Sequence, residues 1–415
     1  MSTYDLWTQE AICPGQPLTR AALDEYTLDA WNTLLKHVTA HSVYYKAFPK
    51  SLDALTDVRR LPTMCAEDIT RFGHQMLCVS QGEIHRVLTV ESSGTTGKPK
   101  RLFFTREDLE ATVGFYAQGY LELIVPGDVV LVLYPHKNEH SVGRLVGKAL
   151  ERMGARPVYC MPGAPFAEMC RLIQTEGVCS ISGMPTTVLS LARYSEAFGH
   201  RFSIKSLMIC GDYFSPYARA EMERIWGCQT FDHYGLSESG LGLALECPYH
   251  TGMHIWERNI YVEILDESGT PVPDGIWGEI TLTTLARRGQ PLIRYRTGDR
   301  GRLLPGDCAC GSVLKRLDRI AGRIVETKKA FSIHALDEVI FPLSGDIIDY
   351  AAQQTENGLH LDVLSCASGE TLEVCIKRWR PDVDLTVYPA EQAGPVCPGK
   401  RAFLNEPLNC MWGIA

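Results

Sequence analysis

The sequence predicts an α/β fold with a small antiparallel β subdomain and a small α+β C-terminal domain. Two observations carry this prediction. From about residue 87 to 240, strand-like apolar runs alternate with helix-like segments, which is typical of βαβ units and a largely parallel sheet. From about 253 to 305, short strand-like runs are separated by turns such as Pro273-Asp274-Gly275, which indicates antiparallel pairing in a small barrel or distorted sheet.

The bulk composition limits the classes of protein to consider. A chain of 415 residues with 45% hydrophobic and 22% charged residues is globular and too long for one ordinary core. Its net charge of −8 argues against a nucleic-acid partner. We find neither a run of about 18 apolar residues nor a signal peptide, so we expect no membrane span and a cytoplasmic location. The 15 scattered cysteines are then free thiols or metal ligands.

Residues 1 to about 85 are predicted to be mainly helical. The segment 21–38 carries apolar residues at helical spacing and contains neither glycine nor proline. A second helix is expected where Glu67 and Asp68 follow the turn at Pro62. We interpret this region as a helical flank that packs on the α/β segment.

The α/β segment follows. Its expected strands are 87–90, 102–104, 128–134, 157–160, 179–183, 206–210 and 229–234. Its expected helices are 142–153, 166–176, 185–194 and 218–226. Because ligands of parallel sheets bind beyond the carboxyl ends of the strands, Gly211-Asp212 and Tyr234-Gly235 are expected to meet in one crevice.

The last third of the chain is predicted from shorter runs. Strands are expected at 260–264, 278–284 and 292–296 in the antiparallel region. In the tail, alternating apolar residues predict a strand at 361–365 and a second at 371–376, while Pro381 onward is either helix or loop.

A stretch rich in glycine, hydroxyl and lysine residues separates the first two expected strands. It reads Ser92-Ser93-Gly94-Thr95-Thr96-Gly97-Lys98-Pro99-Lys100. Successive backbone N–H groups in such a turn can bind a phosphate, with hydroxyls and lysine as further donors. The spacing is not that of a P-loop, because no Ser or Thr follows Lys98. The alternative is a plain polar hairpin loop.

Four motifs in a fixed order resemble those of the adenylate-forming (AMP-binding) superfamily. They are this loop, Tyr234 to Glu238, Tyr295 to Asp299, and Gly322-Arg323. Three stretches further resemble the phenylacetate-CoA ligase-like branch, namely 254–257, 291–296 and 319–323. The resemblance implies an N-terminal adenylation domain over 1–323, divided into a helical flank (1–85), an α/β part (86–245) and a β subdomain (246–323). A small, divergent C-terminal domain would span 324–415.

The resemblance also implies roles for individual residues. Ser92, Ser93, Gly94, Thr95, Thr96, Gly97 and Lys98 would surround the phosphates of ATP. The rest of the ATP and AMP site would comprise Gly211, Asp212, Asp232, His233, Tyr234, Gly235, Ser237, Glu238, Asp299 and Arg323. Tyr234 would stack on adenine, Asp299 would bind the ribose, and Arg323 would lie at the hinge before the C-terminal domain. Glu238 would hold Mg²⁺, and Lys98, Glu238 and Lys400 would be the catalytic residues.

The implied reaction activates a carboxylic acid, aryl or small acyl, as an acyl-adenylate with release of pyrophosphate, followed by transfer to CoA. The acid pocket would draw on Tyr134, His136, Gly183, Met184 and Gly235. The polar run from His136 to His140 favours an acid with an extra anionic or hydroxyl group. The alternative is that Lys137 and Glu139 face solvent.

The tail departs from the pattern of the superfamily and leaves the acyl acceptor open. The segment after Arg323 has neither paired aspartates nor a glycine-bearing loop; Glu326 is its nearest acidic residue, and Lys400 is the only candidate for the late catalytic lysine. The acceptor could be CoA, an amine or a carrier-protein thiol, so an amide-forming ligase is an alternative. A non-catalytic nucleotide sensor is a second alternative, against which the intact loop, Glu238 and Asp299 argue. Dimers are common among the ligases that this chain resembles, so a homodimer is one assembly to test, although the sequence itself leaves the oligomeric state open.

A separate set of cysteines and histidines predicts a structural zinc site. Cys308 and Cys310 lie on one tight turn, and Cys247 is followed by His250 and His254. Thiolate and imidazole are ordinary zinc ligands, and four protein ligands close a structural site. We favour Cys247, His254, Cys308 and Cys310, with His250 as the substitute for His254. The alternative is a group of unligated thiols beside a core histidine.

Overall fold

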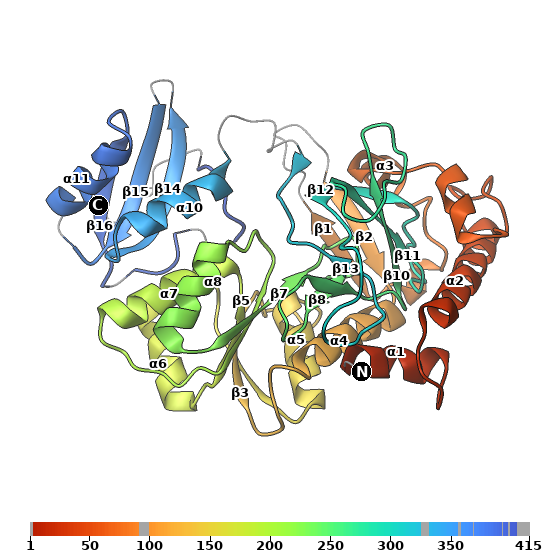
Figure 1. The fold of residues 1–415 in the computed structure, drawn as a ribbon, viewed down its shortest axis with the longest axis horizontal. Coiled ribbons are helices and arrows are strands. Elements are labelled where there is room, and N and C mark those ends of the chain that lie inside the picture. The colour runs from red at the N-terminus through yellow and green to blue at the C-terminus, as the bar shows by residue number, and fades with distance from the viewer. Residues whose placement is uncertain are drawn as a thin grey trace. The chain divides into compact units, whose positions relative to one another are not determined.

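The computed structural model describes residues 3–90, 99–324, 332–355, 358–367, 369–391, 393–396 and 399–404. The chain forms two compact units, each built from two separate segments (Figure 1). Unit 1 comprises Met1–Glu122 and His233–Val325, and unit 2 comprises Leu123–Asp232 and Glu326–Ala415. Across the described ranges, no helix combines the length and the apolar character that crossing a membrane requires.

Unit 1 combines a helical flank with short antiparallel sheets. Its helices are α1 (Thr3–Ile12), α2 (Arg20–His41), α3 (Ala66–Phe72) and α4 (Arg106–Tyr120), with 3₁₀ turns η1 (Leu55–Arg60) and η2 (Gln81–Glu83). Its strands are β1 (Arg86–Val90), β2 (Lys100–Phe104), β8 (Ala244–Glu246), β9 (Met253–Ile255), β10 (Ile260–Leu265), β11 (Gly278–Thr284), β12 (Tyr295–Gly301) and β13 (Arg316–Leu317).

The helical flank forms as the apolar spacing predicts. Helix α2 begins after Thr19, whose hydroxyl accepts the backbone N–H of Ala22 and so satisfies one of the free donors of the first turn. Leu23, Trp31 and Leu35 recur on one face of this helix and are fully buried. The flank is therefore part of the core of unit 1.

Two antiparallel pairings in unit 1 position functional candidates. Strands β1 and β2 form a hairpin in which Val90 pairs with Lys100. Strands β10, β11 and β12 form a three-stranded sheet with an irregularity between Glu279 and Thr281. This sheet is the predicted antiparallel region, although its third strand begins at Tyr295 rather than at Leu292.

Unit 2 contains the parallel sheet and the C-terminal α+β elements. Its first segment holds β3 (Val129–Leu133), α5 (Val142–Arg152), β4 (Arg156–Tyr159), α6 (Phe166–Glu176), β5 (Ser180–Gly183), α7 (Pro185–Ala197), β6 (Ser206–Cys210), α8 (Pro216–Trp226) and most of β7 (Gln229–Tyr234). Its second segment holds α10 (Ile333–Leu343), β14 (Ile347–Thr355), β15 (Gly358–Ser365), α11 (Gly369–Trp379) and β16 (Asp384–Pro389).

The parallel sheet brings several strand ends to one edge. The strand order within unit 2 is β7, β6, β5, β3, β4. Leu133 pairs with Gly183, and Gly183 pairs with Ile209, so β3, β5 and β6 end level with one another. The segments that follow these strands therefore start at the same edge, as expected for a ligand-binding α/β sheet.

The C-terminal elements share one hydrophobic core with helices α6, α7 and α8. The same buried cluster includes Leu189 and Leu191 of α7 together with Ile340 and Phe341 of α10 and Tyr350 of β14. Figure 1 shows α10 and β14 beside α7 and α8. Independent movement of 324–415 as a domain stays a prediction.

Two predictions for the tail were wrong. The segment 371–376 is helical, within α11, and not a strand. Its buried residues are Leu372 and Ile376, four positions apart, which suits one face of a helix. The residues after Pro381 form strand β16, which pairs in parallel with β15 and was expected to be helix or loop.

Candidate functional site

The glycine-rich stretch is anchored by a hairpin whose loop lies outside the described residues. Ser92, Ser93, Gly94, Thr95, Thr96, Gly97 and Lys98 all fall in that undescribed loop. The flanking strands β1 and β2 pair from Arg86–Phe104 to Val90–Lys100. Lys100, the last lysine of the stretch, is thereby fixed at the start of β2.

Lys100 lies against Glu238, the residue predicted to bind magnesium. The Lys100 ammonium contacts Glu238 Oε1, and the Tyr295 hydroxyl donates to the same oxygen at 2.8 Å. Burial is the largest single influence and opposes ionisation of Glu238, but the Lys100 charge and the hydrogen bonds from Lys100, Tyr295 and the Glu238 backbone together hold the pKa of Glu238 below its usual range. Glu238 is therefore an anion at neutral pH, and the contacts from Lys100 and Tyr295 both fall on Oε1.

The loop that carries Glu238 is tightly folded. Ser239 Oγ accepts the backbone N–H of Leu236 at 3.1 Å, and Leu241 adopts φ of 74°, a conformation uncommon for a residue with a side chain. A Cβ on Gly235 would lie 2.2 Å from the Leu241 carbonyl oxygen. Packing therefore requires glycine at position 235. Ser237, another predicted nucleotide-site residue, is half-buried in the same loop.

Arg287 supports the backbone of Glu238 from inside the core. Its Nη1 donates to the Glu238 carbonyl oxygen, and its guanidinium lies 4.2 Å from the centre of the Phe104 ring. Burial lowers the pKa of Arg287, while the negative charges of Asp108 and Glu238 act in the opposite direction. Arg287 thus ties the Glu238 loop to β2.

Tyr234, Asp299 and Arg323 come together as a second cluster in unit 1. The Tyr234 hydroxyl donates to Asp299 Oδ2 at 2.7 Å, and Arg323 Nη1 lies 3.0 Å from Asp299 Oδ1. Gly298 has φ of 77°, and a Cβ there would be 3.2 Å from Arg323 Nη1. The predicted adenine, ribose and hinge residues are therefore in direct contact.

His233 lies in the core of unit 1. Its ring is 5.3 Å from that of Phe115 and 5.4 Å from that of Tyr116. Burial lowers the pKa of His233 to about 3, so the imidazole is neutral at physiological pH. Its predicted place in the nucleotide site can involve only its backbone in this arrangement.

Gly211 and Asp212 follow β6 in unit 2. Gly211 has φ of 103°, and a Cβ there would lie 3.2 Å from Met184 Cε. Asp212 accepts the backbone N–H of Tyr213 at 2.9 Å and that of Arg401. Asp232, also predicted for the nucleotide site, is half-buried in β7.

Four of the five acid-pocket candidates belong to unit 2. Tyr134, Gly183 and Met184 directly follow or end the level strands β3 and β5, and His136 Nδ1 lies 3.1 Å from the Tyr134 carbonyl oxygen. The fifth, Gly235, belongs to unit 1.

The polar run beside the acid-pocket candidates faces outward. Lys137 and Glu139 are exposed. Glu139 forms an ion pair with Lys148 at 3.2 Å. This placement favours the solvent-facing interpretation of the two residues.

The predicted metal ligands form one cluster in unit 1. The ligand atoms of Cys247, His254, Cys308 and Cys310 all lie within 4.8 Å of one another. Cys310 Sγ is 3.4 Å from His254 Nε2, and burial raises the pKa of Cys247 to about 12. His250 Nδ1 instead lies 3.2 Å from a Glu246 carboxylate oxygen. The histidine of the cluster is therefore His254, the one we favoured. A soft, four-donor set of this kind fits Zn²⁺.

Three residues of the Glu238 environment were missed as site residues. Lys100 and Tyr295 stand inside motifs that we identified, but their contact with Glu238 depends on how β2 and β12 are placed. Arg287 belongs to no motif we recognised. The motifs were therefore a signal for Lys100, as a second lysine in the phosphate-loop stretch, and for Tyr295, as the first residue of its motif.

A family model and several curated relatives match this sequence. A family model described as "AMP-binding enzyme" matches residues 90–285. The phenylacetate-coenzyme A ligase of Escherichia coli (strain K12) is 32% identical over 328 residues, covering 74% of this chain and 73% of that protein. The phenylacetate-coenzyme A ligase of Aromatoleum evansii is also 32% identical, over 338 residues, covering 75% of this chain and 73% of that protein.

Solved structures share the fold. A 2-hydroxyisobutyryl-CoA ligase in the postadenylation state, in complex with R3-HIB-AMP, has a TM-score of 0.76 at 20% identity, covering 95% of this chain and 92% of that chain. The amide bond synthetase McbA of Marinactinospora thermotolerans has a TM-score of 0.51 at 17% identity, covering 77% of this chain and 68% of that chain. At these identities the likeness concerns the fold alone.

Proposed function

This chain belongs to the adenylate-forming (AMP-binding) superfamily, in its phenylacetate-CoA ligase-like branch, and we propose that it is an AMP-forming acid–CoA ligase. A carboxylate oxygen of the acid attacks the α-phosphorus of ATP, and the bond to the β-phosphate breaks to release pyrophosphate. The CoA thiol then attacks the acyl carbon, loses its proton and displaces AMP. Charge builds on phosphoryl oxygens in the first step, so positioned cations and N–H groups supply the catalysis.

The Glu238 cluster is the single observation that carries this proposal. A buried carboxylate held ionised, with the contacts from Lys100 and Tyr295 both on Oε1, can offer its second oxygen to a hard divalent cation. Mg²⁺ bound there would neutralise phosphate charge. Arg287 and Tyr295 hold the Glu238 backbone and carboxylate in place for this role.

The remaining nucleotide contacts belong to the proposal as well. The loop from Ser92 to Lys98 would bind the ATP phosphates, Tyr234 would stack on adenine, and Asp299 would accept the ribose hydroxyls. The contact between Tyr234 and Asp299 at 2.7 Å supports the last two roles, because it fixes both side chains relative to each other. Lys400 would be the catalytic lysine of the C-terminal segment.

A structural zinc ion at Cys247, His254, Cys308 and Cys310 is part of the proposal. Zinc would join the turn at 247–254 to the turn at 308–310, and so brace the segment that follows Asp299. The buried Cys247 thiol, with its raised pKa, would be stabilised as a thiolate by such a cation.

The acid is expected to be aryl or small acyl. Exposure of Lys137 and Glu139 removes the main argument for an extra anionic group on the acid, while His136 keeps its place next to Tyr134. Exchange of His136 for Ala tests this point. An unchanged preference across a panel of acids would end the idea of a polar substituent.

Acid-dependent exchange of pyrophosphate into ATP tests the activation step. A panel of aryl and small acyl acids should include at least one that supports exchange, and Glu238→Gln should lower that exchange rate by about 10²–10³-fold. Glu25→Gln is the matched control, because Glu25 is exposed on α2. ATP binding without exchange for any acid would instead favour the non-catalytic sensor.

Product identification tests the acceptor and the assembly. Adding CoA, then amines and amino acids, and measuring product mass separates a CoA ligase from an amide-forming ligase. An amide product in place of a thioester would contradict the proposed second step. The homodimer and the cytoplasmic location stay predictions.

A further inference from the structure

Arg401, the residue after Lys400, is a buried cation with several partners. Its side chain is 1% exposed. Nε lies 3.0 Å from Asp337 Oδ1, and Nη1 lies 3.0 Å from Asp349 Oδ1 and donates to the Tyr350 carbonyl oxygen at 2.6 Å. The guanidinium also lies 4.3 Å from the centre of the Tyr350 ring. The Tyr350 hydroxyl in turn donates to Asp337 at 2.8 Å.

These contacts fix Arg401 from two elements at once. Asp337 belongs to α10, whereas Asp349 and Tyr350 belong to β14. A guanidinium presents its donors in a rigid planar fork, so two carboxylates and one carbonyl define its position and its orientation. Buried charges persist only where such partners compensate them, which makes alternative placements of Arg401 unfavourable.

The backbone of Arg401 is held by a third element. Its N–H donates to Asp212 Oδ2, and Asp212 follows β6 directly after Gly211. The other carboxylate oxygen, Asp212 Oδ1, accepts the Tyr213 N–H at 2.9 Å and lies 3.5 Å from His334 Nε2. Asp212 is therefore the point at which the C-terminal segment is tied to the edge of the parallel sheet.

Lys400 is exposed, but the contacts of the next residue, Arg401, fix the position of its backbone. Successive Cα atoms lie about 3.8 Å apart, so Lys400 begins one residue from the fixed Arg401. The Arg401 N–H that bonds Asp212 belongs to the peptide bond between Lys400 and Arg401, so the Lys400 backbone lies beside the loop that follows β6. Only the flexible lysine side chain remains free to reach a ligand.

We infer that Arg401 is a positioning residue that aims Lys400 at the edge of the sheet beyond β6. The inference rests on the proposed function, in which Lys400 takes part in adenylation. Arg401 itself would touch neither ATP nor the acid. Its buried side chain and its backbone contact with Asp212 would determine where the Lys400 ammonium can reach.

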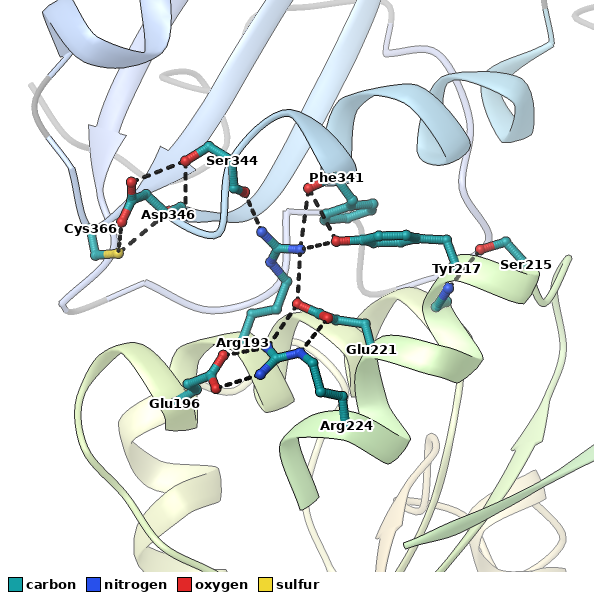
Figure 2. A network of polar contacts seen from close by, with 11 residues as sticks. Arg193, Glu196, Ser215, Tyr217, Glu221, Arg224, Phe341, Ser344, Asp346 and Cys366 are labelled. Carbon is teal, nitrogen blue, oxygen red and sulfur yellow. Dashed lines mark hydrogen bonds and ion pairs between the residues drawn. The ribbon is translucent and has the colours of Figure 1, made fainter. Parts of the chain in front are cut away.

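A purely structural role for Arg401 is the competing explanation, and Arg193 supplies its control. Figure 2 shows Arg193 of α7 between α8 and the end of α10, with its side chain also 1% exposed. It donates to Tyr217 Oη at 2.9 Å and to the Phe341 carbonyl oxygen at 3.3 Å. Arg193 thus anchors the same C-terminal segment without being next to Lys400.

A double-mutant cycle separates the two roles. Arg401→Met should lower kcat for acid-dependent pyrophosphate exchange by about 10²-fold, the loss expected when a reacting group is displaced by about 1 Å. KM for ATP and for the acid should change little, because Arg401 touches neither. The K400A/R401M double variant should be no slower than K400A, whereas K400A/R193M should lose whatever R193M alone loses. All rates are measured per folded protein, at a temperature where thermal unfolding shows each variant to be native.

Three outcomes would overturn the inference. The first is a kcat in R401M equal to that of the wild-type protein. The second is a loss of rate caused by R401M that persists in full when Lys400 is already Ala. The third is an exchange rate in K400A equal to that of the wild-type protein. If R401M does not fold, R401K decides in its place: it keeps the charge but not the fork, and its loss of rate must again vanish in the K400A background. Absence of exchange in the wild-type protein would instead refute the proposed function before the cycle begins.

Discussion

The charges at Glu238 in unit 1 and Arg401 in unit 2 are both buried, but they are held differently. Among the described residues, the side-chain contacts to the Glu238 carboxylate come from Lys100 and Tyr295, and both fall on Oε1. Arg401 has two carboxylates, a carbonyl and an aromatic ring around it. A buried carboxylate with one cation beside it can bind a further cation, whereas a guanidinium held by two buried carboxylates fixes the chain around it.

Removing the Arg401 cation should give the largest effect on stability. Arg401→Met leaves Asp337 and Asp349 buried without their counter-charge, so the free energy of unfolding should fall by about 3–5 kcal/mol. Denaturant unfolding of R401M beside the wild-type protein measures this loss. A change below about 1 kcal/mol would mean that the carboxylates find other partners, and the comparison with Glu238 would fail.

Glu238→Gln should reduce activity more than stability. The amide keeps the shape of the side chain but loses the charge, so we expect a loss in kcat of about 10²–10³-fold, as for other removed electrostatic contacts. Exchange kinetics across a range of Mg²⁺ concentrations measure it. A variant that unfolds easily but, when folded, turns over normally would show that Glu238 serves the fold, as Arg401 does.

The cluster of Cys247, His254, Cys308 and Cys310 extends the comparison of Glu238 with Arg401. We predict that these donors need a bound metal ion as their counter-charge. Purified protein should contain about one zinc ion per chain, and Cys308→Ser should lower that content. Chelation should destabilise the fold, by about 2.7 kcal/mol at a free zinc concentration 100 times Kd. Elemental analysis and thermal unfolding with and without chelator provide the measurements; metal-free protein of unchanged stability would contradict the site.

His233 should make unit 1 sensitive to acid, with a smaller effect. Its pKa is about 3 in the folded chain and near 6.5 when unfolded, so below pH 6.5 the unfolded state binds a proton that the folded state does not. Its contribution to stability is complete above pH 6.5 and decreases as the pH falls, by about 2 kcal/mol at pH 5.

Denaturant unfolding between pH 7 and pH 5 tests this sensitivity. His233→Gln should flatten the dependence, while the control His41→Gln, on the exposed end of α2, should not. Equal slopes for the two variants would show that other groups govern the acid response.

Much of the fold could be predicted from apolar periodicity. The wrong predictions fall where tertiary packing or the backbone conformation of a single residue decides the structure. The strands of the parallel sheet are continuous apolar runs, for which burial on both faces leaves little choice. The segment 371–376 is short and mixes apolar with polar residues, so its pattern fits a strand or a helix. It forms a helix because Leu372 and Ile376, on one helical face, pack into the core beside the C-terminal sheet. Arg294 adopts φ of 50°, which is not a strand conformation, so β12 begins at Tyr295 and not at Leu292. The alternation of apolar residues does not predict this conformation.

The candidate site divides in the same way. Glu238, Asp299 and the cysteine cluster could be proposed because each stands in a short motif or spacing. Arg287 and Arg401 could not, because their roles arise from contacts across long stretches of chain. Residues that support a site are set by tertiary packing, and a single sequence carries little trace of it.

The contact between Asp212 and Arg401 has a consequence for synthesis on the ribosome. The two residues are 189 positions apart. At about 5–20 residues per second, the ribosome adds Arg401 about 10–40 s after Asp212. For most of that interval the nascent parallel sheet lacks α10 and the strands β14 to β16, and Asp337 and Asp349, once they are made, have no Arg401 to pair with until the interval ends. The growing chain therefore exposes apolar surface of this shared core during much of its synthesis.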